Sequence, residues 1–350
     1  MRVTVTGGTG NLGTAVVTAL CREPAVAEVV VAARRPPTTW ELPGRARFVR
    51  VDVGSDDLTP VVAGSDAVVH LAWLFQPTRR PAITWQANAV GSSRVFAAAA
   101  RAGAGALVHA SSVGAYSPGP GRTVDESWPT HSVPTAGYGR EKAYAERALD
   151  GVEGRHPEMR IVRVRPAFVF QRASGTQQRR LFIGPFLPRS ILRAGRLPAL
   201  PLPAGLRFQA LHASDVGRAI AAACLADVRG AFNLAAEPVL DGSAVADIVG
   251  ARLVEVPRWL MRSGVAAAWH ARLVPVEPPL LDLVLGLPLL DTGRARTELD
   301  WAPRVPADVA LREAFGGMAE GAGGGTAPLA PDSFRGRVHE VTTGVGASGL

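Results

Sequence analysis

The sequence predicts a doubly wound α/β fold, in which helices cover both faces of a parallel sheet and a smaller mixed α/β lobe follows. Two observations predict this class. Short valine-rich runs alternate with helix-like runs up to about residue 166, and a glycine triplet stands directly after the first run. Strands that are apolar throughout are typical of a parallel sheet buried on both faces. In such sheets, ligands bind at the carboxyl ends of the strands.

The expected strands are the runs VTVT, VVVAA, RFVRV, AVVHLA, ALVHAS and IVRVR, at 3–6, 29–33, 47–51, 67–72, 106–111 and 161–165. Between them, apolar residues recur at helical spacing, which predicts helices over 12–22, 56–63, 88–103 and 138–152. The order strand, helix, strand is typical of parallel crossover units.

The rhythm changes after residue 166, where prolines cluster between 185 and 203. The second half predicts a strand at 231–235 and helices over 214–226, 243–250, 257–286 and 306–320. We therefore expect a sheet domain over 1–166, to which later segments return, and a substrate lobe over 167–320. Residues 321–350 are rich in Gly, Ala, Pro and Thr without periodicity, which predicts a disordered tail.

Composition narrows the function. The net charge of +8 is spread over scattered arginines rather than a basic tract, which argues against nucleic acid and favours anionic small molecules. The two cysteines suggest neither a disulfide framework nor a metal site. No signal peptide and no apolar run of about 18 residues is apparent, so we expect a cytoplasmic protein without a membrane partner. A small-molecule substrate is the expected partner, and the sequence leaves a homodimer open.

The stretch TGGTGNLG, residues 6–13, follows the first strand and opens the first helix. Gly7 suits the tight turn, Gly10 lets the backbone approach a pyrophosphate, and Gly13 lets the helix pack close to the strand. Asn11 and Leu12 form the first turn of that helix, whose free N–H groups bind anions. This placement predicts a dinucleotide site.

The end of the second strand indicates which dinucleotide. Ala32 and Ala33 stand where NAD-binding chains usually place a ribose-binding carboxylate, and Arg34 and Arg35 follow. Guanidinium groups pair with phosphate, so the charges favour NADP, with NAD as the alternative. A solvated arginine pair is the competing interpretation. Asp52 is placed to accept a hydrogen bond from the adenine amine, or else to be a turn residue that caps the next helix.

Tyr138 and Lys142 lie four residues apart on an expected helix and share one face. Lys142 is the only lysine among the 38 basic residues. A phenol with a pKa of about 10 is a poor base at neutral pH, and a neighbouring ammonium favours the phenolate. The hydroxyl of Ser112, after the fifth strand, can hold a substrate oxygen beside the tyrosine. These residues predict proton transfer.

Together, the T-G-x-x-G-x-x-G loop, Ser112, the Y-x-x-x-K motif, the R-P pair at 165–166 and H-A-S-D-V at 212–216 resemble the extended branch of the short-chain dehydrogenase/reductase superfamily, the NAD-dependent epimerase/dehydratase family. The resemblance covers residues 1–320 and implies an NAD(P)-binding Rossmann domain with Ser112, Tyr138 and Lys142 as the catalytic set. It places the cofactor over Gly7–Gly13 and beside Asp52, Val53, Leu71, Ala72 and Pro166, with Tyr138 and Lys142 also touching it. Asn88 matches a family asparagine behind the active site, or is a mid-helix asparagine bound to backbone.

The chain departs from the family where substrate selection is expected. Val113 and Gly114 follow Ser112 where sugar-nucleotide dehydratases have acidic residues, so the acid and the base that water elimination requires are absent. The expected substrate-binding residues are aromatic or hydroxylic, apart from one histidine: Trp73, Phe75, Ser112, Phe168, Phe208 and His212. Arg207 is a candidate diphosphate partner. For His212 we favour a structural role, because HASD also fits a strand end followed by a helix cap and Tyr138 and Lys142 already supply the acid–base function.

Three functions remain. The first is an NAD(P)-dependent oxidoreductase that moves hydride between nicotinamide and a carbinol or carbonyl carbon of a fairly apolar small molecule. The second is a nucleotide-sugar 4-epimerase, which would use the same residues for transient oxidation and need tightly kept NAD. The third is a non-catalytic NADP-sensing or scaffold protein, against which the intact Ser112, Tyr138 and Lys142 argue.

Overall fold

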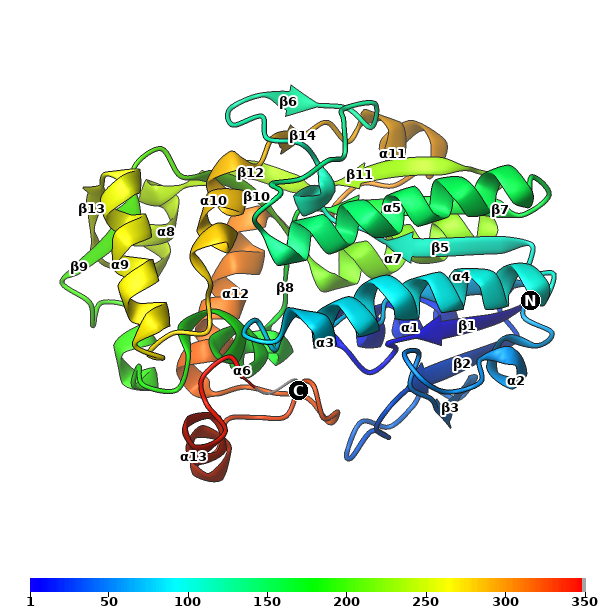
Figure 1. Ribbon diagram of the computed structural model, residues 1–350, viewed down its shortest axis with the longest axis horizontal. Coiled ribbons are helices and arrows are strands. Elements are labelled where there is room, and N and C mark those ends of the chain that lie inside the picture. The colour runs from blue at the N-terminus through cyan, green and yellow to red at the C-terminus, as the bar shows by residue number, and fades with distance from the viewer. Residues whose placement is uncertain (348–350) are drawn as a thin grey trace.

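The computed structural model of the protein describes residues 1–347, in which a seven-stranded, wholly parallel sheet forms the main domain. The strand order is β11-β7-β5-β4-β1-β2-β3 (Figure 1). The bounds are β1 (Arg2–Thr6), β2 (Glu28–Ala33), β3 (Ala46–Arg50), β4 (Ala67–His70), β5 (Ala106–Ala110), β7 (Arg160–Pro166) and β11 (Gly230–Leu234). The doubly wound α/β class predicted from the sequence is confirmed.

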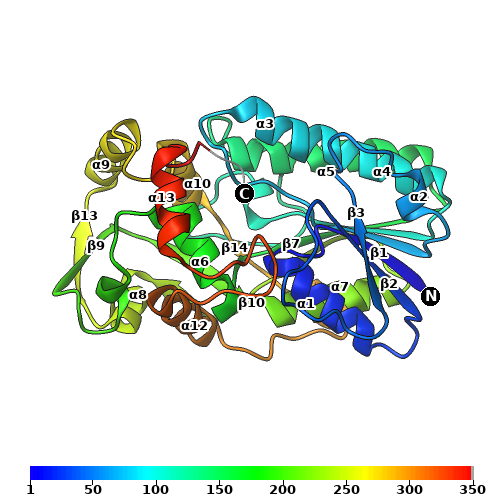
Figure 2. The same ribbon diagram turned by 90° about the horizontal axis from the view of Figure 1, so that it is seen from below.

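Helices cover both faces of this sheet. Figure 2 shows α1 (Asn11–Arg22) and α7 (Ala213–Leu225) on one face, and α4 (Gly91–Arg101) and α5 (Gly137–Arg155) on the other. Short helices α2 (Thr59–Val62) and α3 (Pro81–Trp85) accompany the second pair, and α11 (Gly293–Glu298) packs near β11. A side chain at Gly217 would lie 2.7 Å from the Ala15 carbonyl oxygen, so this glycine lets α7 approach α1 closely.

Apolar side chains on the two faces of the sheet form two core layers. Val3 and Val5 of β1 belong to the layer under α1 and α7. Val68 of β4 and Leu107 of β5 belong to the layer under α4 and α5. Burial of each such aliphatic side chain contributes roughly 1.5–3 kcal/mol. Because both faces of the sheet are covered, its strands are apolar at nearly every position. This is why the strands could be predicted from the sequence.

The smaller lobe carries short sheets and helices, at the left of Figure 1. The strands of the lobe pair as β12-β10-β8 and β13-β9, and a separate pair, β14 with β6, lies at the top of Figure 1. The strand bounds are β6 (Thr123–Val124), β8 (Phe168–Phe170), β9 (Ala199–Pro203), β10 (Arg207–His212), β12 (Ala236–Asp241), β13 (Arg252–Val256) and β14 (Leu289–Leu290). The helices are α6 (Gly175–Gln178), α8 (Gly242–Val249), α9 (Arg258–His270), α10 (Pro278–Gly286) and α12 (Ala307–Glu320).

The prediction of a disordered tail is wrong for residues 321–347; residues 348–350 lie outside the described part. Helix α13 (Phe334–Thr342) and the segment before it pack against the lobe, and Figure 2 shows the orange-red chain after α12 reaching the start of α1. Buried Asp332 meets Arg337 at 2.8 Å and Arg179 and Arg189 at 3.5 Å each. Polar contacts rather than an apolar stripe hold this segment, so hydrophobic periodicity does not reveal it.

Within residues 1–347, no helix is both long and apolar enough to cross a bilayer.

We predict that Asp332→Ala lowers the thermal stability of the protein. The side chain of Asp332 is 3% exposed and that of Arg179 is 1% exposed. Arg179 also pairs with Glu340 at 2.5 Å, so its charge keeps a partner when Asp332 is removed. The expected cost is therefore that of losing hydrogen bonds to a charged group, about 1.5–3 kcal/mol, and the melting temperature should fall by roughly 2–5 °C. Asp227→Ala is the matched control, since the Asp227 side chain is 99% exposed. Equal melting temperatures for the two variants would show that the tail is not held in this way.

Candidate active site

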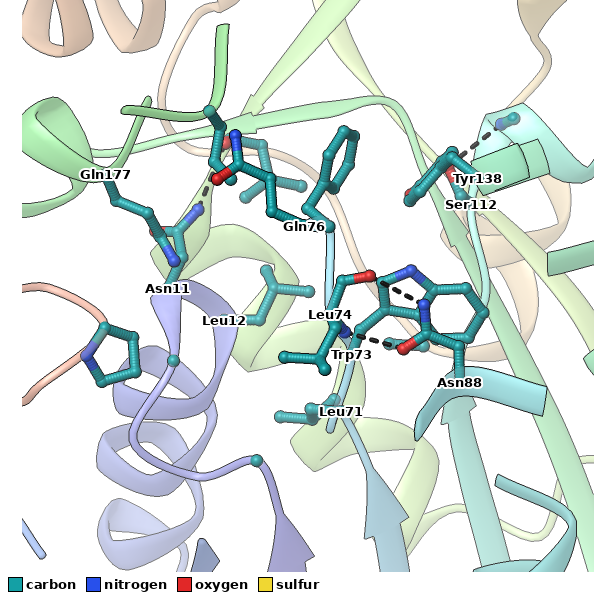
Figure 3. Close-up of a pocket in the computed structure, with 18 of the residues that line it drawn as sticks. Asn11, Leu12, Leu71, Trp73, Leu74, Gln76, Asn88, Ser112, Tyr138 and Gln177 are labelled. Atoms are coloured by element: carbon teal, nitrogen blue, oxygen red, sulfur yellow. Dashed lines mark hydrogen bonds between the residues drawn. The ribbon is translucent and has the colours of Figure 1, made fainter. Parts of the chain in front are cut away.

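One cavity of about 1090 Å³ lies between the carboxyl ends of the sheet strands and the lobe. Its lining brings together residues that are distant in sequence, several of which are labelled in Figure 3. Every cofactor-site residue predicted from the sequence lines it, and so does every predicted substrate-site residue except His212. Tertiary structure thus gathers into one space the motifs that the sequence spreads over 200 residues.

The glycine turn between β1 and α1 fits a pyrophosphate. Gly7 has a φ of +75°, and a side chain there would lie 2.5 Å from the backbone nitrogen of Ala72. A side chain at Gly13 would lie 2.3 Å from the Gly7 carbonyl oxygen, so only glycine permits this packing. The turn is closed by a 3.0 Å hydrogen bond from Gly10 N–H to the Gly7 carbonyl. The N-terminus of α1 thereby faces the cavity, where its free N–H groups favour an anion.

Asn11 connects this turn to the lobe. Its side-chain amide donates to the Val169 carbonyl at 3.3 Å (Figure 3). The side-chain amide of Gln171 donates to the Asn11 side chain at 2.8 Å. The first turn of α1 is therefore anchored on the segment that begins with β8. The position of the lobe and the geometry of the glycine turn depend on each other.

The part of the cavity next to the end of β2 is basic. Arg34 and Arg35 are exposed and line the cavity directly after β2. Burial and the charge of Arg34 both lower the pKa of Arg35, so an anion placed between them would be favoured. Asp52 also lines the cavity, and its carboxylate accepts from Gly54 N–H at 2.9 Å. Asp52 thus caps its own turn, and its contact with an adenine amine stays a prediction.

The predicted reactive residues meet at the start of α5. Tyr138 and Lys142 lie one turn apart, and the Tyr138 hydroxyl is hydrogen-bonded to Ser112. The Ser112 hydroxyl oxygen also accepts from Gly114 N–H at 3.0 Å, which fixes its orientation (Figure 3). The phenol, the hydroxyl and the ammonium therefore face the same cavity.

The pKa of Tyr138 departs from the sequence-based expectation. Burial raises it to about 12, although the hydrogen bond with Ser112 acts in the opposite direction. The ammonium of Lys142 lies 6.0 Å from the centre of the Tyr138 ring and does not outweigh this burial. In this environment the tyrosine is protonated at neutral pH.

Lys142 is buried beneath the indole of Trp73. Its ammonium lies 3.4 Å from the centre of the indole ring and donates to the Ala110 carbonyl at 2.7 Å. Burial lowers the pKa of Lys142 to about 7, against partial opposition from Glu146 and Glu141. The ring face and the carbonyl replace only part of the water that an exposed ammonium would have.

Asn88 holds the loop that covers this pair. Its side chain makes two 2.7 Å hydrogen bonds with the backbone of Leu74, one to the N–H and one to the carbonyl (Figure 3). It also donates to the buried carboxylate of Glu141 at 2.6 Å. Burial raises the pKa of Glu141, and the bonds from Asn88 and Thr84 oppose that rise. Asn88 is thus a backbone-bound asparagine that also lines the cavity.

Two expectations about the substrate side need correction. His212 does not line the cavity: its ring nitrogen accepts from Ser214 N–H at 3.2 Å and begins α7, and its other nitrogen lies 3.3 Å from Glu313. Its conformation is set by its place at the end of β10, which points it away from the cavity. Arg207 is exposed on β10 and does not line the cavity either.

Sequence reasoning found the aromatic part of the substrate side but missed its aliphatic part. Phe75 packs against Tyr138 with ring centres 4.6 Å apart and ring planes tilted by 30°, and Phe168 meets Phe208 edge to face at 5.4 Å. Beyond them the wall is aliphatic and comes mainly from α8, α9, α10 and α12. It includes Val245, Val265, Leu280, Leu281, Leu283, Val284, Leu311 and Met318. The apolar run PPLLDLVLG was the available signal, but helical periodicity does not distinguish a cavity wall from a core face.

Among residues 1–347, no three His, Cys, Asp or Glu side chains are grouped closely enough to hold a metal ion.

The comparison with known proteins decides the family. The NAD dependent epimerase/dehydratase family matches residues 3–235 of the chain. The chain belongs to this family. Members are enzymes, and the glycine turn and reactive residues of this chain lie in the matched part. Family membership supports an NAD(P)-dependent oxidoreductase or epimerase type of chemistry.

Individual relatives agree with this assignment. The 4-hydroxy-2-methyl-3-oxo-4-farnesyl-3,4-dihydroquinoline-1-oxide ketoreductase of Stigmatella aurantiaca is 32% identical over 171 residues, which are 49% of this chain and 51% of that protein. The chain thus spans about half the length of this relative. An uncharacterized protein of Mycobacterium tuberculosis is 26% identical over 314 residues, covering 86% and 80% of the two chains. The structure of UDP-glucuronic acid 4-epimerase from Bacillus cereus in complex with NAD aligns with a TM-score of 0.66 at 17% identity, covering 91% and 98%. That likeness shows the fold.

We predict that the buried Lys142 makes stability rise with pH in this family member. Its folded-state pKa of about 7 lies below the ordinary value of 10.5. The unfolded chain therefore binds the proton more tightly, and stability increases between these two values by up to about 1.4 kcal/mol per pH unit.

Lys142→Met removes this dependence, so its melting temperature relative to wild type should be highest near neutral pH and decline toward pH 10. Thermal unfolding across this range measures the difference, with Arg140→Met on the exposed side of α5 as control. A constant difference between Lys142→Met and wild type would refute the depressed pKa.

Proposed function

We propose that the protein is an NADP(H)-dependent oxidoreductase that transfers hydride between the nicotinamide and the carbonyl or carbinol carbon of a neutral, hydrocarbon-rich molecule. The single observation that carries this proposal is the composition of the substrate side of the cavity. Between residues 166 and 347, the cavity lining contains no Asp, Glu, Lys, Arg or His. Its polar side chains there are the amides of Gln177 and Gln178.

Such a wall suits an uncharged substrate. A nucleotide sugar carries a diphosphate, which proteins usually bind with arginine, lysine or clusters of backbone N–H groups. Burying an ion without a partner is costly, whereas each buried methylene group contributes about 0.8 kcal/mol. The Stigmatella relative is by name a ketoreductase for a farnesyl-bearing ketone, which supports the same class of substrate.

Each residue around the expected reaction centre has its own role in the proposed hydride transfer. The cofactor, when bound, supplies or accepts the hydride. Tyr138 donates the proton to the carbonyl oxygen, or accepts it in the reverse direction, and Ser112 holds that oxygen by a hydrogen bond. Lys142 brings a positive charge next to the phenol and can donate to the ribose hydroxyls. The ring of Phe75 packs against the phenol and limits its contact with water.

The preference for NADP(H) is proposed from the charges after β2. Ala32 and Ala33 offer no carboxylate to a ribose 2′-hydroxyl, and Arg34 and Arg35 line the cavity beside them. A 2′-phosphate would be bound by charge-assisted hydrogen bonds there. The glycine turn serves the pyrophosphate of either cofactor, so NAD(H) is expected to bind more weakly rather than to be excluded.

The nucleotide-sugar 4-epimerase is the rival within the same family. It would use Ser112, Tyr138 and Lys142 for transient oxidation, and the NAD-bound epimerases of similar fold make it the natural alternative. The charge-free wall is the observation against it.

We predict that Tyr138→Phe reduces turnover by about 10²–10⁴-fold, because the general acid is lost while the ring and its packing remain. The assay follows NADPH oxidation with 2-dodecanone as the carbonyl probe, and titration calorimetry with NADP+ should give a nearly unchanged affinity. Tyr144→Phe is the matched control, since Tyr144 lies on the same helix and is 41% exposed. A Tyr138→Phe variant with wild-type rates would remove the catalytic assignment. Wild-type conversion of UDP-glucose without net NADPH consumption would establish the epimerase instead.

We predict that Arg34→Ala weakens NADP+ binding by roughly 10- to 100-fold and leaves NAD+ binding nearly unchanged, because one charge-assisted hydrogen bond to the 2′-phosphate is worth about 1.5–3 kcal/mol. Ala33→Asp should reverse the preference by repelling that phosphate. Dissociation constants from titration calorimetry test both variants, with Arg155→Ala on the exposed end of α5 as a control for net charge. If wild type binds both cofactors equally and Arg34→Ala weakens both alike, the NADP preference is wrong.

A further inference from the structure

The segment after α12 folds into a tight turn, which we call the C-terminal turn and define as residues 324–329. Gly324 N–H donates to the Leu329 carbonyl at 2.5 Å, and Leu329 N–H donates to the Thr326 carbonyl at 3.0 Å. Leu329 is 2% exposed and Thr326 is 1% exposed, so these two residues of the turn are buried. Pro328 lines the cofactor cavity.

The C-terminal turn contacts the glycine turn directly. The Thr326 hydroxyl donates to the Thr9 carbonyl at 2.8 Å. Thr9 lies between Gly7 and Gly10, lines the cavity, and is 4% exposed. The hydroxyl thus fixes one peptide group of the turn that is expected to surround the pyrophosphate. A methyl group in its place would leave the buried carbonyl without this partner.

The same turn contacts the loop after Arg34 and Arg35. The Gly325 carbonyl accepts from Thr38 N–H at 2.7 Å and from the N–H groups of Thr39 and Trp40 at 3.1 Å each. A side chain at Gly325 would lie 2.1 Å from the backbone nitrogen of Trp40, so this contact requires glycine. The Gly325 carbonyl oxygen therefore accepts hydrogen bonds from three successive N–H groups, and this fixes the path of the loop that follows Arg34 and Arg35.

A third arginine is fixed by the C-terminal turn. Arg180 donates to the Pro328 carbonyl at 2.8 Å. Burial lowers the pKa of Arg180, and the charge of Glu340 opposes this effect. The C-terminal turn thereby also holds the guanidinium group of Arg180.

We propose that Thr326 and Gly325 are positioning residues for the cofactor site, so that the C-terminal turn sets both cofactor affinity and the preference for NADP(H). Thr326 acts through the glycine turn, which serves the pyrophosphate of either cofactor. Gly325 acts through the arginine loop, which serves the 2′-phosphate alone. The second part rests on the proposed NADP(H) dependence, whereas the first does not.

Titration calorimetry of the full chain with NADP+ and NAD+ tests the proposal. Thr326→Val should weaken both cofactors by about 2- to 10-fold, the effect of one neutral hydrogen bond, and Thr326→Ser should restore both. Thr342→Val is the matched control, because that hydroxyl bonds within α13 to the His339 carbonyl. Wild-type affinities in Thr326→Val, or a Thr326→Ser variant as weak as the valine variant, would overturn the role of the hydroxyl.

Gly325→Ala should weaken NADP+ more than NAD+, while Gly316→Ala, where a side chain meets nothing within 4 Å, should change neither. Equal losses for both cofactors in Gly325→Ala would overturn its role in specificity. If wild type shows no NADP+ preference, the proposed cofactor is wrong, yet the Thr326 variants still decide the positioning of the glycine turn through NAD+ affinity.

Discussion

The buried carboxylate of Glu146 is the interaction on which the geometry of the site depends. It is fully buried, accepts two hydrogen bonds of 2.9 Å from Arg165, and accepts one of 2.6 Å from Ser111. Burial alone would raise its pKa, but the hydrogen bonds and charge of Arg165 outweigh this and lower it. Because Glu146 lies on α5 and its partners lie on or next to β5 and β7, the pair fixes the helix that carries Tyr138 and Lys142. Separating such a pair typically costs about 3–5 kcal/mol.

The opposite electrostatic situation exists one turn earlier on the same helix. Lys142 has no carboxylate at hydrogen-bond distance among its described contacts, and a carbonyl oxygen and the face of Trp73 are its close partners. Its charge is therefore held at a cost, which the pKa of about 7 expresses. A positive charge in this state responds strongly to any negative charge that develops nearby, including that of a phenolate. Glu146 gives the site rigidity, and Lys142 gives it electrostatic sensitivity.

The cavity has two chemically different halves because two kinds of element build it. The carboxyl ends of parallel strands bring turns together, and turns carry backbone N–H groups and charged side chains such as Arg34, Arg35 and Asp52. The lobe presents one face of each of several helices, and those faces are apolar. Asn11 joins the halves through its bond to Val169. The C-terminal turn contacts the charged half through its hydrogen bonds to the glycine turn and to the loop after Arg35.

The sequence by itself determined the sheet, because strands covered on both faces are continuous valine-rich runs. It also determined the glycine turn and the spacing of Tyr138 and Lys142, because these depend on contacts within a few residues. Glu141 and Asn88, Glu146 and Arg165, and Thr326 and Thr9 meet across 53, 19 and 317 residues, respectively. No local pattern encodes such pairs, so the loop over the reactive residues and the ordered C-terminal segment were decided by tertiary structure. His212 also shows what the sequence leaves open, because its sequence position allowed both a pocket residue and a helix cap. In the structure its ring caps α7, and apolar side chains form the cavity wall instead. Sequence periodicity reports which residues are buried, whereas packing decides what they are buried against.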